Sequence, residues 1–226
     1  MVSFLPGVPF LCVGGMPSSG STLCFNIFRE LYESVGKIVG VYNGDGMPIY
    51  VTGDRPKFMM EMILLKNHLG CSYADININV CRDIRDSVAS TIRRNPNFLN
   101  GDVIKVAQRN MEWHDACAAQ DTPIVEWVYE KYKKNPIETT TRLMRACHPW
   151  GPPEALIQQV ITTAEGLFDN TPHLQHDNND PRTLLTSNHR SAGGRIGSYR
   201  ETLEQWQIEA LEDIYGDWLR ERGYME

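Results

Sequence analysis

A glycine-rich turn between an apolar run and an amphipathic segment constrains the fold of this chain most strongly. The turn reads GGMPSSGSTL, Gly14 to Leu23, and it follows a short apolar stretch that begins at Phe10. Beyond it, apolar side chains recur at helical spacing: Leu23, Ile27 and Leu31. Residues 10–15 are therefore expected to form a buried strand and residues 21–35 a helix, joined by a tight turn.

This turn nearly matches the phosphate-binding pattern G-x-x-x-x-G-K-[ST]. Gly15 and Gly20 have the required spacing and Thr22 stands at the Ser/Thr position, but Ser21 replaces the lysine. Backbone N–H groups in such a turn bind anions together with the start of the next helix, without any charged side chain. Because the lysine neutralises charge on terminal phosphates, this turn is suited to bind a phosphate and poorly suited to kinase chemistry. An ordinary strand-to-helix turn is the alternative.

Strands and helices alternate along the rest of the chain. The patterns predict further strands at residues 62–66, 73–81 and 123–130, and helices at 83–94, 102–119, 137–147 and 153–165. This alternation predicts a single α/β domain over residues 1–226, with three α/β/α layers around a central parallel sheet, of the P-loop nucleotide-binding type.

A last helix is expected near the C-terminus. Thr202 and Gln205 have the spacing of a capping box at its start. Its buried stripe is predicted to consist of Leu203, Trp206, Ala210, Ile214 and Trp218.

Charge and cysteine content narrow the functional classes. The 22 basic and 28 acidic side chains give a net charge of −6, which argues against a nucleic-acid partner. The six cysteines form no CxxC pair, so they are expected to be buried free thiols in a reducing compartment. No segment has the length and apolarity of a membrane span, and no basic leader precedes the first strand. A cytoplasmic protein without a membrane partner is therefore expected.

A second motif, VCRDIRDSVASTIRR, runs from Val80 to Arg94. Arg82 lies at the expected strand end, and Asp83 is placed to cap the following helix. Ser87, Ser90 and Arg94 fall on one polar face of that helix. An arginine fork, a serine hydroxyl and helix N–H groups make a second phosphate site, and a solvated amphipathic helix is the alternative.

Together the two motifs resemble those of the sulfotransferases that use 3′-phosphoadenosine 5′-phosphosulfate (PAPS). In that family a P-K/R-S-G-[ST]-[ST] loop holds the 5′-phosphosulfate, and five residues match it: Pro17, Ser19, Gly20, Ser21 and Thr22. In the second signature, R-[DN]-P-[RK]-D-x-x-x-S, the arginine and the serine hold the 3′-phosphate. Arg82 and Ser90 match them, whereas Ile84 replaces the proline.

The C-terminal segment resembles the glycine-rich basic loop that closes over the nucleotide in this family. Gly197, Tyr199 and Arg200 match its G-x-W-[KR] element. The resemblance then implies that Arg190 and Arg195 are further ligands of the 3′-phosphate.

The resemblance also implies catalytic residues. LLKNHLG resembles the K-T-H segment whose histidine is the base, which makes His68 the candidate base and places Lys66 beside it. Glu61 is the alternative base, and a histidine bonded to neighbouring backbone is the structural alternative. The family has Lys or Arg at Ser18, where it steadies the bridging oxygen of the donor. Another cation must replace it for fast turnover, with Lys66 the nearest candidate.

The function implied is transfer of a sulfuryl group from PAPS to a hydroxyl or amine of a small-molecule acceptor. The product nucleotide is 3′-phosphoadenosine 5′-phosphate (PAP), and no metal is required. A P-loop nucleotide kinase-like protein and an inactive nucleotide-binding protein remain the alternatives. Neither the acceptor nor the oligomeric state follows from the sequence.

Overall fold

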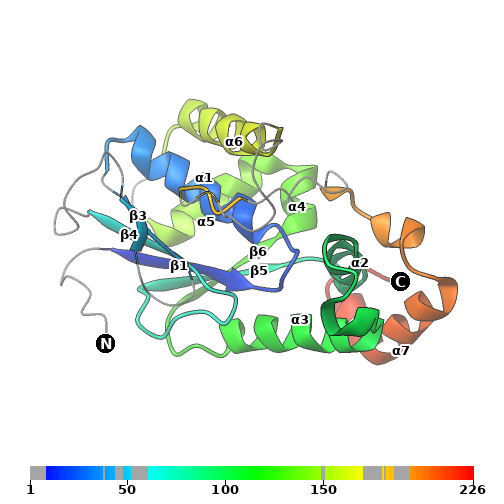
Figure 1. Cartoon of the computed structure of the whole chain (residues 1–226). Coiled ribbons are helices and arrows are strands. Elements are labelled where there is room, and N and C mark those ends of the chain that lie inside the picture. Colours follow the sequence, from blue (N-terminus) through cyan, green and yellow to red (C-terminus); the bar gives the residue numbers. More distant parts are fainter. Residues whose placement is uncertain are drawn as a thin grey trace.

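The computed structural model describes residues 9–37, 39–43, 48–51, 61–148, 151–169, 180, 182–185 and 194–226. Within them, strands form a single sheet in the order β3-β2-β4-β1-β5-β6 (Figure 1). The strands are β1 (Phe10–Gly15), β2 (Val39–Asn43), β3 (Pro48–Val51), β4 (Met62–Lys66), β5 (Ile76–Cys81) and β6 (Ile124–Val128). Five of them pair in parallel and only β3, at the edge, is antiparallel to its neighbour.

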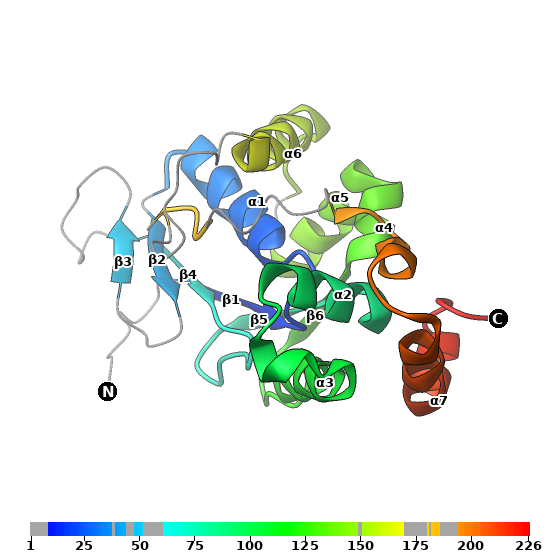
Figure 2. The ribbon, with the colours of Figure 1, turned by 45° about the vertical axis from the view of Figure 1, so that its right-hand side comes forward.

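Helices cover both faces of the sheet, as Figures 1 and 2 show. One face carries α1 (Ser21–Ser34), α4 (Tyr129–Lys134), α5 (Pro136–Cys147) and α6 (Glu154–Asp169). The other side of the molecule carries α2 (Ile84–Arg94), α3 (Val103–Ala118) and α7 (Gln205–Glu221). Short 3₁₀ turns lie at Phe98–Gly101 and Ser198–Glu201. The three-layer α/β/α architecture with a central parallel sheet is thereby confirmed.

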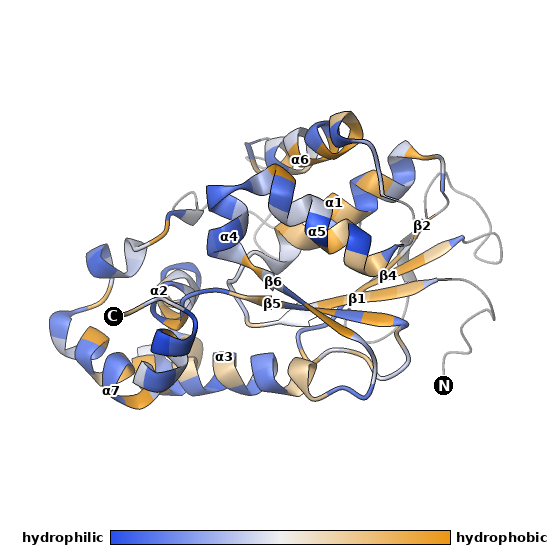
Figure 3. Cartoon of the chain, turned by 180° about the vertical axis from the view of Figure 1, so that it is seen from behind, coloured by the Kyte–Doolittle hydropathy of each residue, from blue (hydrophilic) through white to orange (hydrophobic). Residues whose placement is uncertain are grey.

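The central strands are buried on both faces, which explains their continuous apolar sequence. Leu11 and Val13 pack into the core under α1, whereas Phe10 and Cys12 join a smaller cluster on the opposite face. This alternation follows from the two-residue period of a strand. Figure 3 shows β1 and β4 coloured as hydrophobic along most of their length.

Two element boundaries differ from the sequence-based expectation. The strand expected at residues 73–81 begins only at Ile76, and Tyr73 lies in an exposed turn. The strand expected at 123–130 ends at Val128, because the short helix α4 begins at Tyr129. Apolar and aromatic residues suit both conformations, so composition alone did not locate these ends.

The predicted capping box of Thr202 and Gln205 is wrong. The residues that form the box are Glu204 and Gln207, and Glu204 N–H donates to Gln207 Oε1 at 2.9 Å. Thr202 instead closes the preceding 3₁₀ turn, because its N–H donates to the Tyr199 carbonyl at 3.0 Å.

The predicted buried stripe of the last helix is also wrong in part. Leu203 is buried as expected, but Trp206 and Ile214 are 60% and 53% exposed. The buried positions of α7 are Ile208, Leu211, Gly216 and Leu219. The helix carries apolar residues on two overlapping stripes, and packing on the neighbouring helices selects the second one.

The expectation that the cysteines are free thiols is confirmed, whereas the reducing compartment stays a prediction. All six cysteines are free thiols, and five of them are buried, with Cys71 half-buried. Among the described residues, no helix combines the length and apolarity needed to cross a membrane. The extent of the domain, residues 1–226, stays a prediction.

The orientation of α7 predicts unequal effects of two alanine substitutions. Leu211→Ala removes a fully buried side chain and is expected to lower the free energy of unfolding by about 2–5 kcal/mol. Ile214→Ala, on the exposed face of the same helix, should change it by no more than about 0.5 kcal/mol. Urea unfolding of both variants measures the difference, and equal losses would contradict this orientation.

Candidate functional site

A pocket of about 630 Å³ opens where three parallel strands end. The glycine-rich loop follows β1, Lys66 and His68 stand at the end of β4, and Arg82 follows β5. Parallel sheets bind ligands at this edge because the turns after neighbouring strands converge there. The lining residues come from these turns, from four helices and from the C-terminal segment at Gly194: Pro17, Ser18, Gly20, Ser21, Thr22, Leu23, Lys66, His68, Arg82, Ser90, Arg94, Tyr129, Lys133, Glu165, Phe168, Asp169 and Gly194.

The loop conformation depends on its glycines. Gly15 and Gly20 both have φ of 89°, a left-handed conformation that favours glycine. A Cβ atom on Gly20 would lie 2.6 Å from the Tyr129 ring, so no larger residue fits there. The first turn of α1 has neither a side-chain cap nor an acidic residue. Its N–H groups can therefore bind an anion from the pocket.

The hydroxyl groups of the loop have different surroundings. Ser19 is fully buried and donates to the carbonyls of Met16 and Val80, beneath the loop. The Ser18 hydroxyl instead lies 2.7 Å from Thr91 Oγ1 and accepts a hydrogen bond from Arg94. Pro17, Ser18, Gly20, Ser21 and Thr22 thus line the pocket, whereas Ser19 shapes the loop from below.

Ser87 does not share the pocket-facing surface with Ser90 and Arg94. Its buried hydroxyl donates to the Pro17 carbonyl at 2.6 Å and accepts from Asn110 of α3 at 2.8 Å. The side chain therefore ties the loop to α2 and α3. Ser90 and Arg94, one turn apart, do line the pocket.

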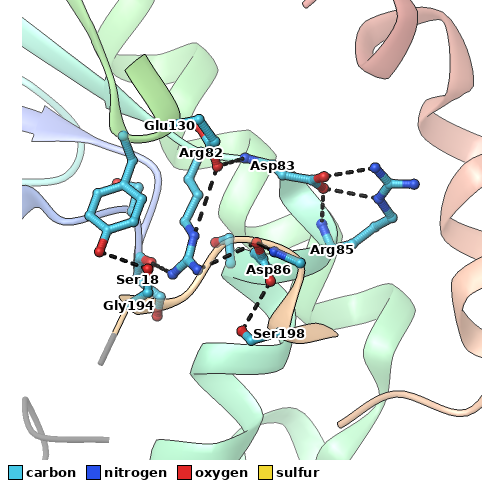
Figure 4. A network of polar contacts seen from close by, with 12 residues as sticks. Ser18, Arg82, Asp83, Arg85, Asp86, Glu130, Gly194 and Ser198 are labelled. Atoms are coloured by element: carbon cyan, nitrogen blue, oxygen red, sulfur yellow. Dashed lines mark hydrogen bonds and ion pairs between the residues drawn. The ribbon is translucent and has the colours of Figure 1, made fainter. Parts of the chain in front are cut away.

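Arg82 connects the loop to the C-terminal segment (Figure 4). Its guanidinium donates to the Arg195 carbonyl at 2.7 Å and to the Ser18 carbonyl at 3.5 Å. It also lies 3.4 Å from Asp86 Oδ2 and 4.8 Å from the centre of the Tyr129 ring. Nε is buried without a hydrogen-bond partner and lies 3.9 Å from Glu130 Oε1, and the Arg82 side chain lines the pocket.

The acidic residues of the second motif serve the structure. Asp83 caps α2 by accepting from the backbone of Arg85 at 2.9 Å, and it also pairs with the Arg85 side chain. Asp86 accepts from Gly197 N–H, Ser198 Oγ and Tyr199 N–H at 2.7, 3.1 and 2.9 Å. The second motif and the C-terminal segment therefore form a single hydrogen-bonded assembly, as Figure 4 shows in part.

Of the two C-terminal arginines expected as phosphate ligands, the structure describes only Arg195. Arg195 is 61% exposed at its side chain and pairs with Glu201 at 2.5 Å. It does not line the pocket; only its backbone carbonyl contacts Arg82. Arg190 lies outside the described residues. Phosphate binding by either arginine stays a prediction.

His68 lies against the loop and α3. Its Nδ1 is 2.9 Å from the Gly15 carbonyl, and its ring stacks on Trp113 at 5.2 Å between centroids. The hydrogen bond assigns the proton to Nδ1 and leaves Nε2 as an acceptor. Burial and then the charge of Lys66 lower the pKa of His68 to about 3, against the opposing effect of the Gly15 hydrogen bond. The imidazole is thus neutral at neutral pH.

Lys66 and Glu61 have different positions. Lys66 lines the pocket, and burial followed by the charge of Arg94 lowers its pKa to about 8. Glu61 is exposed, pairs with Lys37 at 2.9 Å and does not line the pocket. The structure therefore brings Lys66 and His68 together, and leaves Glu61 apart from them.

Sequence reasoning missed the part of the pocket that comes from the middle of the chain. Tyr129 and Lys133 of α4 and Glu165, Phe168 and Asp169 of α6 line it. Lys133 Nζ lies 3.8 Å from Glu165. These residues carry no motif, and only the packing of α4 and α6 beside the loop reveals them.

A group of potential metal ligands, Cys81, His114 and Glu126, lies apart from this pocket. Arg222 already donates to Cys81 Sγ at 3.5 Å and to Glu126 at 2.6 Å. A protein cation therefore compensates the charge of this group.

The sequence matches no protein-family model and no curated protein. Solved structures do match. Mouse sulfotransferase SULT7A1, complexed with PAP, aligns with 94% of this chain and 84% of its own, at 12% identity and a TM-score of 0.61. Retinol dehydratase with retinol and PAP aligns with 92% and 80%, at 17% identity and a TM-score of 0.60. The same enzyme with androsterone and PAP aligns over equal shares, at 16% and 0.58. The chain has the fold of the PAPS-dependent sulfotransferases.

Proposed function

We propose that this protein transfers a sulfuryl group from PAPS to a hydroxyl or amine of a small-molecule acceptor. One observation carries the proposal: a single pocket holds two separate groups of anion-binding donors. The first is the loop with the uncapped start of α1, and the second is Arg82 with Ser90. A nucleotide phosphorylated at both the 5′ and 3′ positions matches two such groups.

The pocket also offers surfaces for the rest of the nucleotide. Phe168 provides an aromatic face and Glu165 a carboxylate that can accept a hydrogen bond from a base amino group. Arg82 lines the pocket with Ser90, and its guanidinium can donate hydrogen bonds to a phosphate there. The residues present therefore fit PAPS and PAP.

The structural neighbours support the acceptor class. Retinol dehydratase was solved with retinol and with androsterone, each beside PAP. A small organic alcohol or amine is accordingly the acceptor class we propose. A cytoplasmic location and chemistry without a metal ion belong to the same proposal.

His68 and Lys66 perform the chemistry in this proposal. The acceptor O–H or N–H loses its proton to Nε2 of His68 as its oxygen or nitrogen bonds to sulfur. The bond from sulfur to the 5′-phosphate oxygen breaks, and that oxygen keeps the electron pair. Lys66 supplies positive charge beside the reacting groups. An anionic donor in the pocket offsets the charges that depress the pKa of His68, which makes the imidazole a stronger base.

The kinase alternative finds no support in the site. Ser21, not lysine, follows Gly20, so the loop lacks the charge that neutralises a terminal phosphate. An inactive nucleotide-binding protein would have the same nucleotide pocket as an active sulfotransferase, and only a measurement of turnover separates the two.

Ligand-dependent melting separates these functions. PAP without magnesium is expected to raise the melting temperature, because it binds only the folded state. Magnesium-ATP should raise it less at equal concentration, and a preference for magnesium-ATP would contradict the proposal. Transfer of radioactive sulfate from PAPS to a panel of alcohols, phenols and amines then distinguishes an active enzyme from an inactive binder.

The second donor group predicts a phosphate-selective defect. Ser90→Ala should weaken PAP binding by about 1–3 kcal/mol, because a hydroxyl that bonds the 3′-phosphate is lost. Adenosine 5′-monophosphate, which lacks that phosphate, serves as the matched control and should bind both proteins equally. Calorimetry measures both ligands, and an equal loss for the two nucleotides would remove Ser90 from the 3′-phosphate site.

If His68 is the base, its removal should affect turnover but not the affinity for PAP. His68→Ala should lower turnover by about 10²–10⁴-fold while PAP affinity is retained, because the base acts on the acceptor. An unchanged rate would exclude His68 as the base.

The ionisation of His68 gives an independent readout. With a pKa near 3 in the free protein, its ring signals should not titrate between about pH 5 and 8 in NMR spectra. The pKa should rise when PAP binds. Titration near the ordinary histidine pKa in the free protein would contradict the burial of His68 and the effect of the neighbouring cations on its pKa.

A further inference from the structure

The loop has Ser18 where the resembling family has a basic residue, and the guanidinium of Arg94 contacts the Ser18 hydroxyl. Ser18 has φ of 57°, and its hydroxyl accepts a hydrogen bond from Arg94 Nη2. Thr91 Oγ1, one turn earlier on α2, lies 2.7 Å from the same hydroxyl. The side chain of Ser18 therefore faces the last turn of α2, where it holds the guanidinium of Arg94.

Arg94 faces the pocket with few partners. It is half-buried and lines the pocket with the loop, Lys66 and His68. Besides Ser18, its Nε donates to the Ser90 carbonyl at 3.4 Å. Within the described part of the chain, no carboxylate pairs with it, whereas Arg82 lies within 4 Å of Asp86 and Glu130. A partly desolvated guanidinium without a counter-charge is less stable than a paired one.

The electrostatic surroundings agree with this geometry. Burial and then the charge of Arg82 lower the pKa of Arg94. Arg94 in turn lowers the pKa of both Lys66 and His68. The cations around the loop thus repel one another in the free protein, and an anion between them would relieve that repulsion.

We infer that Arg94, held by Ser18, binds the 5′-phosphate of the donor and stabilises the negative charge that develops on its bridging oxygen. The inference rests on the proposed function and adds a residue to it. The bond that breaks joins sulfur to this oxygen, which keeps the electron pair. The negative charge that develops on the oxygen is stabilised by Arg94 of α2 instead of by a basic residue of the loop. The charge that the resemblance places at residue 18 is supplied by residue 94.

Arg94 fits this role better than Lys66. Arg94 contacts the loop residue itself, whereas Lys66 stands at the end of β4, two positions from His68. The guanidinium can also donate two parallel hydrogen bonds to a phosphate. Arg93, the preceding residue, has a separate structural task, because it donates to Ser198 and Thr202 outside the pocket.

The test compares two nucleotides that differ in the position of the phosphate. In calorimetry, Arg94→Met should weaken PAP binding by about 10- to 100-fold, because charged hydrogen bonds to the 5′-phosphate are lost. Binding of adenosine 3′-monophosphate, which has no 5′-phosphate, should not change. The double variant Ser18→Lys/Arg94→Met should recover most of the PAP affinity, because the charge is returned to the loop.

Two controls keep the test specific. Lys105→Met removes an exposed cation of α3, outside the pocket, and should leave the binding of both nucleotides unchanged. The melting temperature of Arg94→Met without ligand should not fall, because the substitution removes a repulsive charge. A purely structural role of Arg94 would instead lower melting and weaken both nucleotides equally.

The remaining outcomes are distinct. If the wild-type protein does not bind PAP, the proposed function and this inference both fail. If it binds PAP and Arg94→Met binds it equally well, only the inference fails. A 5′-selective loss in Lys66→Met, with Arg94→Met unaffected, would likewise overturn it and assign the charge to Lys66.

Discussion

The parallel pairing of β1 with β5 is the constraint on which the site depends. It sets Gly15 opposite Val80, so the turns after both strands emerge at the same edge of the sheet. Met16 N–H and Ser19 Oγ then both donate to the Val80 carbonyl, and Arg82 follows two residues later. Two sequence motifs about 65 residues apart therefore become the two walls of one pocket. A shift in this register would separate the loop from Arg82, and the two groups could then no longer bind one ligand together.

Internal anions and cations have separate tasks around this pocket. Asp83 and Asp86 bind protein groups: the first caps α2, and the second holds the backbone of residues 197–199. Lys66 and Arg94 have no carboxylate partner within the described residues. The result is a site with excess positive charge in a protein whose net charge is −6. The overall charge of the chain is thus a poor guide to its ligand, because a few buried donors determine what binds locally.

Much of this arrangement follows from local sequence. The glycine spacing and the apolar run before it predict β1, the loop and α1, and Asp83 correctly predicts the start of α2. Local pattern did not reveal the antiparallel edge strand β3, the buried face of α7 or the helix α4, because tertiary packing decides each of them. The same holds within the site. Ser87 and Ser90 look alike on a helical wheel, yet α3 buries the first and leaves the second in the pocket. Phe168 enters the site only through the packing of α6.

The central claim is that the loop and the pair Arg82 and Ser90 hold the two phosphates of one nucleotide. A crystal structure of the complex with PAP measures this directly. The account predicts the 5′-phosphate on the backbone N–H groups at the start of α1 and the 3′-phosphate within hydrogen-bond distance of both Arg82 and Ser90. A nucleotide bound through the loop alone, with its 3′-phosphate in solvent, would contradict the account.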